Sequence, residues 1–443
     1  MRNLVAWCKK INFALLEQNR TTMLLYNIAI HIYTYLIKVA GKSSQKAKLW
    51  HEGRINLFDR LREAINDDDK IIWIHVASLG EFEQARPIIE KIKSEKPEYK
   101  ILLTFFSPSG YEMRKAYKGA DYIFYLPADT PNNAREFLDI VKPEIAIFVK
   151  YEFWLNLLFE LRKREIRTFI VSAIFRKKSI FFKCWGYKWR EALKSFKTIF
   201  VQDENSKQLL SSIGFNNTIV AGDTRFDRVA EIVAATKEIP YLDLFKGDKL
   251  LLMAGSTWPA DEQIINDAAL QHPNIKILVA PHEIHEKHVG QVEELFGDKC
   301  VRYTSIMPDP KESDAAKKQS EREEKLQKAQ MLILDTMGML SSAYRYADIS
   351  YIGGGFGAGI HNTLEAATFG LPVAFGPKYA KFKEAVDLIS VGASVSISSR
   401  EEFDSWLTPL ITDAELRTQK SEAARKYCAE QCGATDAIMK ELF

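Results

Sequence analysis

Residues 351–377 read YIGGGFGAGIHNTLEAATFGLPVAFGP, and this stretch decides the fold. The apolar run that leads into it, residues 347–352, predicts a short β-strand, and three glycines then precede a helix. That helix carries Ile360, Leu364 and Ala367 at helical spacing and ends at Gly370. The next apolar residues, 371–375, predict a second buried strand. The stretch is therefore a strand, a glycine loop, a helix and a strand.

The glycine loop, Gly353–Gly355, has two interpretations. A helix N-terminus carries unpaired N–H groups and partial positive charge, so a loop without side chains in front of it can hold a phosphate or a carboxylate. Alternatively, the glycines only allow a tight turn. His361, Asn362 and Glu365 favour the anion site, because we expect them on the first helical turns with their polar groups at the same opening.

The rest of the chain repeats this alternation. Because alternating strands and helices are typical of βαβ units, we predict an α/β protein with two doubly wound parallel-sheet (Rossmann-like) domains that face each other across a cleft. The predicted strands are residues 71–76, 101–106, 122–126, 145–149, 168–171 and 198–201 in the first half, and 250–256, 275–280, 331–334, 347–352 and 371–375 in the second.

The predicted domain boundary lies in the middle of the chain. Residues 226–248 contain a helix and a connection without a strand, so we place an interdomain linker there. The first Rossmann-like domain then covers residues 49–225. The second covers residues 249–443 and includes the C-terminal helices.

Composition narrows the class of function. In 443 residues, 61 Lys and Arg stand against 58 Asp and Glu, and this net charge of +3 gives no support for a nucleic-acid partner. The five cysteines are scattered, which suits a reducing compartment. Cys428 and Cys432 are the only close pair and are poor evidence for a metal site, so we predict no metal.

One segment resembles a membrane helix. Residues 23–40 read MLLYNIAIHIYTYLIKVA, but Asn27, His31 and Lys38 interrupt the apolar run. A spanning helix needs about 20 apolar residues, so the interruptions favour a helix that lies in the membrane interface. The basic residues that follow favour the cytoplasmic side. We predict a membrane-associated helix over residues 23–48, with a buried core helix as the alternative.

Residues 1–22 precede that helix and show no pattern. We predict a non-native or disordered extension there, with Met23 as a candidate start. The bulk of the protein is then expected at the cytoplasmic face of the inner membrane.

A second candidate membrane surface is FRKKSIFFKCWGYKWR, residues 175–190, which interleaves six basic residues with six aromatic residues. Nucleic acid is one interpretation, through phosphate contacts and stacking. The nearby membrane helix favours an anionic lipid surface instead. A third interpretation places the aromatic residues in the core and the charges in solvent.

Two carboxylates follow strands of the first half. Glu81 comes after the strand 71–76, and Glu152 comes after the strand 145–149. A carboxylate at a helix N-terminus is favoured by the helix dipole, and it can also serve as a general base. Since both would lie at one edge of one sheet, the structural and catalytic interpretations are about equally supported.

In the second half, four strand ends carry small or polar groups. Together they predict a nucleotide-sugar site that lacks the Walker lysine and a metal-chelating pair of aspartates. The four segments are residues 255–258, 281–285, 335–338 and 376–383. His282, His285 and His288 suggest a metal site, but no Asp or Cys completes it, so we expect them to cap a helix or contact ligand.

These motifs, in this order, resemble the 3-deoxy-D-manno-octulosonic acid (Kdo) transferases of Gram-negative lipopolysaccharide synthesis, which are inverting glycosyltransferases of the GT-B fold. Residues 75–81 are similar to the family's HxxSxGE, residues 151–154 to TELW and residues 222–227 to GxxKFD. Residues 335–338 and 353–365 are similar to DTMGE and GGS…GGHNxLE. The resemblance extends from about Met23 to the C-terminus.

The resemblance implies CMP-Kdo as donor and the lipid A disaccharide precursor (lipid IVA) as acceptor, without a cofactor. It implies that Glu81 is the general base and that Arg225 neutralises developing negative charge. The implied acceptor contacts are Ser78, Gly80, Glu152 and Arg176. The implied CMP-sugar contacts are Ser256, Thr257, Pro281, His282, Met337, Gly338, Met339, Gly355, Asn362, Thr363, Leu364, Glu365 and Lys383.

Several positions depart from the family pattern. Lys150 stands where the family usually has Glu, and Arg225 where it has Lys; the others are Ile174, His282, Met339 and Ile360. They affect donor and acceptor contacts more than the reaction class. Two alternatives stay open: a GT-B transferase that uses a UDP-sugar, and a catalytically silent lipid-binding relative.

Overall fold

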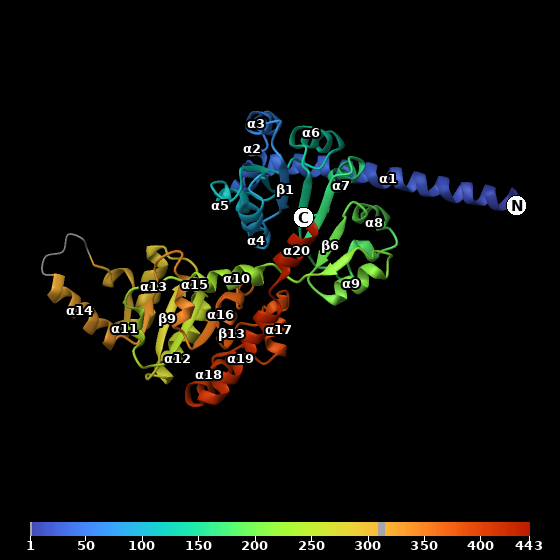
Figure 1. The fold of residues 1–443 in the computed structure, drawn as a ribbon. Coiled ribbons are helices and arrows are strands. Elements are labelled where there is room, and N and C mark those ends of the chain that lie inside the picture. Colours follow the sequence, from blue (N-terminus) through green and yellow to red (C-terminus); the bar gives the residue numbers. More distant parts are fainter. Residues whose placement is uncertain (1, 309–314) are drawn as a thin grey trace. The chain divides into compact units, whose positions relative to one another are not determined.

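The computed structural model describes residues 2–308 and 315–443, and within the first helix it describes side chains from Thr21 onward (Figure 1). The chain forms two compact units. Unit 1 comprises Met1–Arg228 together with Gly433–Phe443, and unit 2 comprises Val229–Cys432. Each unit is built on one parallel sheet.

The sheet of unit 1 has seven strands in the order β3-β2-β1-β4-β5-β6-β7. Their bounds are β1 Ile71–Val76, β2 Lys100–Phe105, β3 Tyr122–Tyr125, β4 Ile145–Val149, β5 Arg167–Ala173, β6 Thr198–Val201 and β7 Thr218–Val220. Strand order reverses between β1 and β4, where Trp73 pairs with Ala146. In open parallel sheets, ligands bind beyond the carboxyl ends of the strands at such a switch point.

Helices cover both faces of this sheet. Ile71 and Trp73 belong to a core cluster shared with Phe137 and Leu158 on one side, whereas Ile72 and Ile74 belong to a cluster on the other side. The helices of unit 1 are α1 Arg2–Ala40, α2 Gln45–Glu52, α3 Leu57–Ala64, α4 Leu79–Glu95, α5 Pro108–Arg114, α6 Pro131–Val141, α7 Leu155–Lys163, α8 Tyr187–Leu193, α9 Glu204–Ser211 and α20 Ala434–Leu442, with a short 3-10 turn at Ile180–Phe182. Helix α10, Arg225–Ala234, leads into unit 2.

The sheet of unit 2 also has seven parallel strands, in the order β10-β11-β9-β8-β12-β13-β14. Their bounds are β8 Leu251–Thr257, β9 Lys276–Pro281, β10 Cys300–Arg302, β11 Met331–Ile333, β12 Ile349–Ile352, β13 Val373–Phe375 and β14 Ser394–Ser396. The order reverses between β8 and β12, where Tyr351 pairs with Ala254. The glycine loop follows β12 and therefore lies at the switch point.

The helices of unit 2 complete its layers. They are α11 Leu242–Lys246, α12 Pro259–Gln271, α13 Glu286–Phe296, α14 Ala315–Lys328, α15 Leu340–Ala343, α16 Leu364–Thr368, α17 Lys383–Ser390, α18 Arg400–Thr412 and α19 Ala414–Glu430. Leu252, Ile277 and Tyr351 pack with Phe403 and Leu407 of α18 in the core. The prediction of two doubly wound α/β sheets is confirmed.

The assignment of the C-terminal helix to the second domain was wrong. Helix α20 packs in unit 1, where Ile438 and Leu442 share a core cluster with residues of α4 (Figure 1). Asp227 fixes its start, because the carboxylate accepts hydrogen bonds from the Gly433 and Thr435 amides and from the Thr435 hydroxyl. These contacts join residues about 200 positions apart in the chain, so local pattern could not reveal them.

The helix after the glycine loop is also shorter than predicted. It begins at Leu364 rather than at Ile360, so His361 and Asn362 belong to the loop and not to the first helical turn. Gly354 and Gly359 have φ angles of 91° and 147°, which keep the chain out of a helix before this point. Asn362 then caps the short helix by accepting a hydrogen bond from the Leu364 amide at 3.1 Å.

The N-terminal helix α1 lies against unit 1 by one face. The Tyr26 hydroxyl donates to Asp129 at 2.6 Å, and Asn156 donates to the Asn27 side chain at 2.9 Å. The segment Thr21–Ala40 is long and apolar enough to cross a membrane, and none of it is buried. The alternative of a buried core helix is therefore wrong for the described side chains. The predicted extension over residues 1–22 lies almost wholly outside the residues whose side chains are described.

The opposite face of α1 is apolar and exposed. It presents seven large side chains at helical spacing: Leu24, Leu25, Ile28, Ile32, Tyr35, Leu36 and Val39. We call this set the apolar stripe. The helix ends at Ala40, and α2 begins at Gln45, so the predicted single helix over residues 23–48 is in fact two helices.

Candidate functional site

In unit 1, Glu81 lies at the switch point between β1 and β4. It occupies the first turn of α4, whose N-cap is Ser78, and its carboxylate accepts a hydrogen bond from the Ala77 amide at 2.5 Å. Glu81 therefore lies at the carboxyl end of β1, and its carboxylate points toward Ala77, the residue that follows this strand. Gly80 is exposed and Ser78 is half-buried beside it.

The surroundings of Glu81 make it a better base than an ordinary glutamate. Burial and, to a smaller extent, the negative charge of Glu152 raise the pKa of its carboxyl group to about 7, although the Ala77 and Ser78 amides and Lys150 act in the opposite direction. A carboxylate with a pKa near 7 is partly ionised at neutral pH and binds a proton more tightly than an ordinary glutamate, as a general base must.

Glu152 follows β4, as predicted, but its side chain is engaged within the protein. It is buried, and its carboxylate lies 3.1 Å from His75 Nε2 and accepts a hydrogen bond from Trp154 Nε1 at 2.7 Å. His75 in turn contacts Thr104 through Nδ1. Acceptor binding by Glu152 stays a prediction. Its negative charge also acts on Glu81.

Three further side chains gather near Glu81. Lys150 follows β4 in a left-handed backbone conformation, with its ammonium group 5.5 Å from the Tyr151 ring centre. Burial raises the pKa of the Tyr151 hydroxyl, and the charges of Arg176 and Glu81 also act on it. The structure thus brings predicted Arg176 and Glu81 to the same tyrosine. The motif containing Tyr151 was recognised, but the tyrosine itself was not predicted as a site residue.

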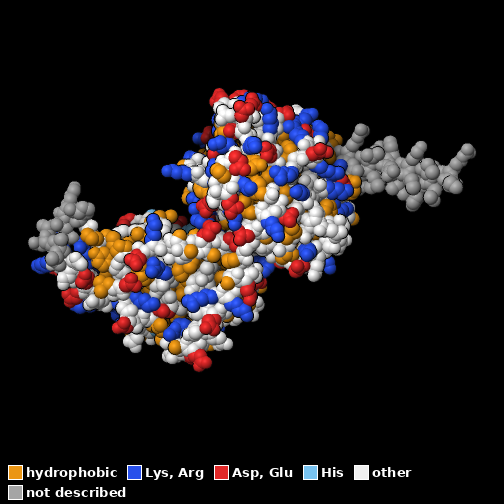
Figure 2. Space-filling view, viewed as in Figure 1, with side chains coloured by type: hydrophobic (Ala, Val, Ile, Leu, Met, Phe, Trp, Pro, Cys, Tyr) orange, Lys and Arg blue, Asp and Glu red, His pale blue; other side chains and the backbone are white. Residues whose placement is uncertain are grey.

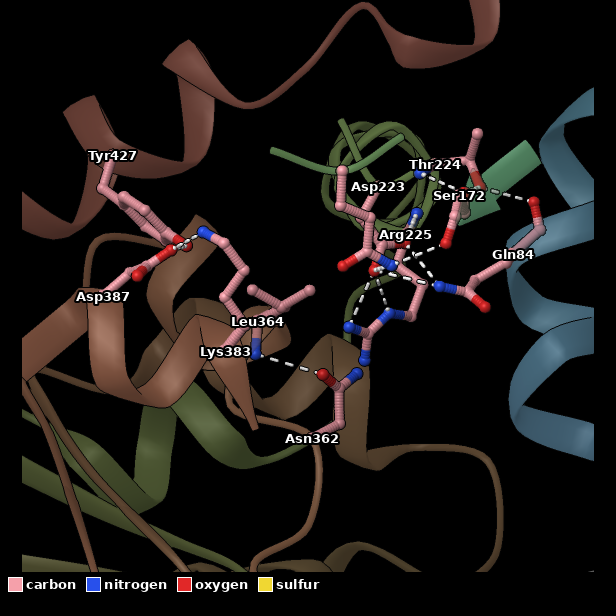
Figure 3. Close-up of polar contacts among 11 residues, drawn as sticks. Gln84, Ser172, Asp223, Thr224, Arg225, Asn362, Leu364, Lys383, Asp387 and Tyr427 are labelled. Carbon is pink, nitrogen blue, oxygen red and sulfur yellow. Dashed lines mark hydrogen bonds and ion pairs between the residues drawn. The ribbon is translucent and has the colours of Figure 1, made fainter. Parts of the chain in front are cut away.

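Arg225 is held in place by Asp223 (Figure 3). The guanidinium donates to Asp223 Oδ2 from Nε at 3.0 Å and from Nη2 at 2.8 Å. Gln84 of α4 donates to both oxygens of the same carboxylate at 3.0 Å. Burial would raise the pKa of Asp223, but Arg225 and these hydrogen bonds lower it below its ordinary value. The sequence did not indicate Gln84, since a helical glutamine carries no motif.

In unit 2, the glycine loop is organised by Asp261. Its carboxylate accepts hydrogen bonds from the Tyr351 hydroxyl at 2.6 Å, the Gly354 amide at 2.9 Å and the Trp258 amide at 3.0 Å. The Gly353 amide donates to the Gly255 carbonyl. Two of the three glycine amides are thus already engaged within the protein, which favours the tight-turn interpretation for them.

Steric contacts explain these glycines further. A Cβ at Gly353 would lie 2.3 Å from the Ser256 carbonyl oxygen, and one at Gly355 would lie 2.6 Å from the Gly376 backbone. The loop therefore passes directly over the ends of β8 and β13. Ser256 beside it has a positive φ of 54° and is half-buried, whereas Thr257 is buried and donates to Glu262.

Glu365 is the carboxylate of this edge, and two side chains hold it. Ser341 of α15 donates to one oxygen at 2.5 Å, and Asn362 donates to the other at 2.9 Å. Ser341 was not predicted. Thr363 and Leu364 are buried, so their backbone is more accessible to a ligand than their side chains, and their contact with a CMP-sugar stays a prediction.

Three aromatic rings stack beside the loop. The ring centres of His282 and His361 lie 4.2 Å apart, those of Trp258 and His282 lie 4.9 Å apart, and Trp258 Nε1 donates to His361 Nε2 at 3.0 Å. Burial, with the neighbouring His282, lowers the pKa of His361 to about 4, so this imidazole is neutral. Trp258 and His361 line a cavity of about 420 Å³ together with Asp261, Phe356 and Gly359.

The remaining predicted donor residues differ in exposure. Met337 and Gly338 are exposed, Met339 is half-buried, and Pro281 is buried at the end of β9. Lys383 forms an ion pair with Asp387, which also accepts a hydrogen bond from Tyr427 at 3.0 Å (Figure 3). Lys383 is therefore engaged within its own helix.

The histidines of α13 have structural partners. His285 caps the helix by accepting a hydrogen bond from the His288 amide, as predicted, and His288 lies 3.1 Å from the buried Glu262. Within residues 2–308 and 315–443, no three or more His, Cys, Asp or Glu side chains are grouped as metal ligands would be.

The sequence matches a known family. The profile of the 3-Deoxy-D-manno-octulosonic-acid transferase (kdotransferase) family matches residues 51–228. A 3-deoxy-D-manno-octulosonic acid transferase of Rickettsia bellii is 28% identical over 365 residues, covering 80% of this chain and 82% of its own length. The enzyme of the same name from Haemophilus influenzae is 26% identical over 385 residues, covering 83% and 85%.

The chain is a relative of the Kdo transferases. The resemblance inferred from the motifs is confirmed, and by this kinship the chain is a glycosyltransferase. The relative from Aquifex aeolicus, which carries the same name, is 25% identical and is covered over 94% of its length.

Solved structures support the fold. The UDP-GlcNAc 2-epimerase of Neisseria meningitidis, solved with UDP-GlcNAc, has a TM-score of 0.56 at 14% identity, covering 84% of this chain and 99% of that one. MurG of Acinetobacter baumannii has a TM-score of 0.52 at 14% identity, covering 84% and 98%. At these identities the likeness shows the fold alone, which is GT-B-like.

Proposed function

We propose that this glycosyltransferase transfers Kdo from CMP-Kdo to the lipid A disaccharide precursor, lipid IVA, in lipopolysaccharide core synthesis. The Kdo transferase relatives support the reaction class, and Glu81 is the observation in the structure that carries the mechanism. Its carboxylate lies at the switch point of the unit 1 sheet, with a pKa raised to about 7 by burial and by Glu152.

The proposed reaction is a single inverting displacement. Glu81 takes the proton from an acceptor hydroxyl, and that oxygen forms a bond to the anomeric carbon of Kdo. The bond from this carbon to the CMP phosphate breaks on the opposite face, and the electron pair leaves with CMP. Arg225 neutralises the negative charge that develops on the leaving group, and its ion pair with Asp223 fixes its orientation. Ser78, Gly80 and Arg176 contact the acceptor.

The proposed donor site lies on unit 2. Glu365 is suited to accept hydrogen bonds from the ribose hydroxyls, because Ser341 and Asn362 already fix both of its oxygens. The Gly355 amide and the backbone of residues 362–364 lie nearest the phosphate. Further contacts come from Ser256, His282, Met337, Gly338, Met339 and Lys383. Following the resemblance, we propose that the reaction needs neither a metal ion nor a cofactor.

The proposed location is the cytoplasmic face of the inner membrane, with α1 lying in the interface. The apolar stripe lies on the face of α1 opposite Tyr26 and Asn27, whose side chains hydrogen-bond to Asp129 and Asn156 in the body of unit 1. Helix α8 packs on α1 through Trp189, and the neighbouring Trp185 and Tyr187 are exposed among lysines. An apolar helix face next to exposed aromatic and basic side chains is typical of a protein that binds an anionic lipid surface.

Charge gives no competing support for nucleic acid. Acidic and basic side chains are interspersed over the visible face, so no single sign dominates it (Figure 2). A duplex-binding surface requires a continuous basic stripe.

The direct test incubates the full chain with CMP-Kdo and lipid IVA in detergent micelles and measures the product mass. Each transfer adds one Kdo mass and releases one CMP. Glu81→Gln keeps the size of the side chain and an acceptor oxygen for the Ala77 amide but removes the basic carboxylate, so we expect it to fold normally, as judged by thermal unfolding, and to lose at least about a hundredfold in turnover. Near wild-type turnover in this variant would refute the assignment of the base.

Thermal stabilisation by nucleotides and binding to liposomes separate the two alternatives. A UDP-sugar transferase would be stabilised thermally by UDP and not by CMP. A catalytically silent lipid-binding relative, for which Lys150 is the motivating departure, would bind liposomes and release no CMP with any donor. Either result would overturn the proposed donor.

A further inference from the structure

Arg54 is a half-buried cation that follows the end of α2. Its Nε donates to the Leu126 carbonyl at 2.8 Å, its Nη1 to the Trp50 carbonyl at 2.9 Å and its Nη2 to the Phe106 carbonyl at 3.0 Å. Each terminal nitrogen carries a second N–H. The guanidinium lies 3.8 Å from the Trp50 ring centre and 4.8 Å from that of Tyr125.

No carboxylate balances this charge within the described residues. The ionisable side chains that act on Arg54 are the tyrosines Tyr33 and Tyr125, and burial lowers the pKa of the guanidinium to about 9, so it remains charged at neutral pH. Carbonyl oxygens and aromatic faces stabilise a cation but leave its net charge in place. A charge that is partly withdrawn from water is costly without a counter-ion, so this position favours an anion.

Two cavities share Trp50 as a lining residue. One of about 260 Å³ is lined by Arg54, His51, Thr34, Asn133 and Ala128, among others. The other, of about 290 Å³, is lined by Tyr33, Ile37, Lys46, Phe106 and Ser107, among others. Trp50 contributes to both. Its indole Nε1–H is buried without a hydrogen-bond partner in the described structure, although a buried N–H normally has one.

Both cavities adjoin α1. Thr34 lines the first cavity, while Tyr33 and Ile37 line the second. A ligand with a polar anionic end and an apolar end would therefore find a cation and hydrogen-bond donors inside and apolar surface outside. Tyr33 and Ile37 supply that apolar surface, since the apolar stripe lies on the opposite face of α1.

The second cavity also adjoins the turn that carries Glu81. Its wall residue Ser107 donates its amide to the Ala77 carbonyl at 2.8 Å, and the Phe106 amide donates to the Val76 carbonyl at 3.1 Å. Ala77 itself donates to Glu81. A ligand bound at Trp50 and Arg54 would thus be separated from the proposed base, Glu81, by the backbone segment of Val76 and Ala77.

We propose that Arg54, Trp50 and the two cavities form a binding site for the phosphate of a membrane lipid. The phosphate lies at the free N–H groups of Arg54 and the indole of Trp50, and its acyl chain follows α1. This inference rests on the membrane association in the proposed function, and on neither the donor nor the base. The competing explanation is purely structural: Arg54 only ties together the segments that contain Trp50, Phe106 and Leu126.

Calorimetric titration of the full chain with short-chain lipids tests the proposal. Dihexanoylphosphatidic acid should bind, whereas dihexanoylphosphatidylcholine, whose headgroup is zwitterionic, and inorganic phosphate alone should bind at least tenfold more weakly. Equal binding of all three would overturn the site. No binding of phosphatidic acid would do the same, whatever the transferase assay shows, because this titration contains no CMP-Kdo.

Variants separate ligand binding from folding. Ala128→Phe fills the first cavity without removing a bond of Arg54, so it should fold and bind phosphatidic acid at least tenfold more weakly. Arg54→Gln removes the charge and should abolish binding if it folds. Arg62→Gln changes an exposed arginine of α3 that is paired with Glu136, and should leave binding unchanged. Wild-type affinity in Ala128→Phe would refute the proposal.

Competition identifies the source of the phosphate. If the acceptor supplies it, lipid IVA should displace phosphatidic acid from the wild-type chain, and Ala128→Phe should raise the KM for lipid IVA without changing that for CMP-Kdo. If a bulk phospholipid supplies it, lipid IVA should not compete. Both outcomes support a lipid-phosphate site and assign its occupant.

Discussion

Glu81 lies between two charges of opposite sign. Glu152, fixed by His75 and Trp154, raises the pKa of the Glu81 carboxyl group, and Lys150 lowers it, both in addition to the larger effect of burial. The protonation of the proposed base is therefore adjustable by single substitutions that do not touch it. Two variants should change it in opposite directions.

Glu152→Gln should shift the acidic limb of the pH–rate profile to lower pH. Removing the negative charge makes ionised Glu81 more favourable, so its pKa falls from about 7 toward the ordinary glutamate value. We expect a shift of roughly one pH unit in kcat/KM, because an interaction of about 1.4 kcal/mol corresponds to one unit. A profile that stays in place or moves upward would contradict the coupling.

Lys150→Met should shift the same limb to higher pH. The methionine keeps much of the side-chain length and removes the positive charge that favours ionised Glu81. Lys118→Met, at an exposed lysine outside the strand ends, serves as control and should leave the profile unchanged. A downward shift in Lys150→Met would show that this lysine does not act on the base.

Glu152 was only partly predictable from the sequence. Its place after β4 was predictable, because a carboxylate after a buried apolar run lies at a strand end. Its burial was not, since it depends on His75, which is 77 positions away on the neighbouring strand and points to the same face as Trp73. Ser341 and Gln84 escaped prediction for the same reason: each acts only through a distant partner.

At the scale of elements, the glycine loop tolerates no side chain at Gly355. A Cβ there would meet the Gly376 backbone at 2.6 Å, so Gly355→Ala should displace the loop from the end of β13. We expect at least tenfold weaker CMP binding by calorimetry. Gly357→Ala is the control, because its nearest contact would be an ordinary 3.5 Å. Unchanged CMP affinity in Gly355→Ala would remove the loop from the donor site.

In unit 1, Asp227 holds the start of α20 in place. Asp227→Ala removes three hydrogen bonds at the start of α20 and should lower the free energy of unfolding by about 1–2 kcal/mol, as the loss of a helix cap does. Urea denaturation measures this. Asp67→Ala, which removes an exposed surface ion pair with Lys142, should have a much smaller effect. Equal effects of the two substitutions would show that Asp227 does not stabilise α20.

Strands with long apolar runs were predicted within one or two residues, because each lies in the sheet interior and is apolar on both faces. The edge strands β7, β10 and β14 were missed. Each has only three residues and one neighbouring strand, so its sequence carries neither a run nor an alternation. The start of α16 was missed because glycine conformation, not apolar spacing, decides it.

At the scale of the whole molecule, the apolar stripe of α1 should control membrane binding. Replacing Leu25, Ile32 and Leu36 with Gln removes three exposed aliphatic side chains. Burial of each such side chain is favourable by roughly 1.5–3 kcal/mol of free energy. Co-sedimentation with anionic liposomes should fall at least tenfold, while CMP binding stays unchanged. Liposome binding that survives this triple substitution would move the membrane surface elsewhere, first to residues 175–190.

The return of α20 to unit 1 has a consequence for synthesis. Because the chain leaves unit 1 after Arg228 and comes back at Gly433, unit 2 is inserted into unit 1 rather than appended to it. On the ribosome, all segments of unit 2 emerge before α20, so unit 2 can reach its native state while unit 1 still exposes the surface of α4 that Ile438 and Leu442 cover. The amino-terminal unit, although made first, is the one completed last.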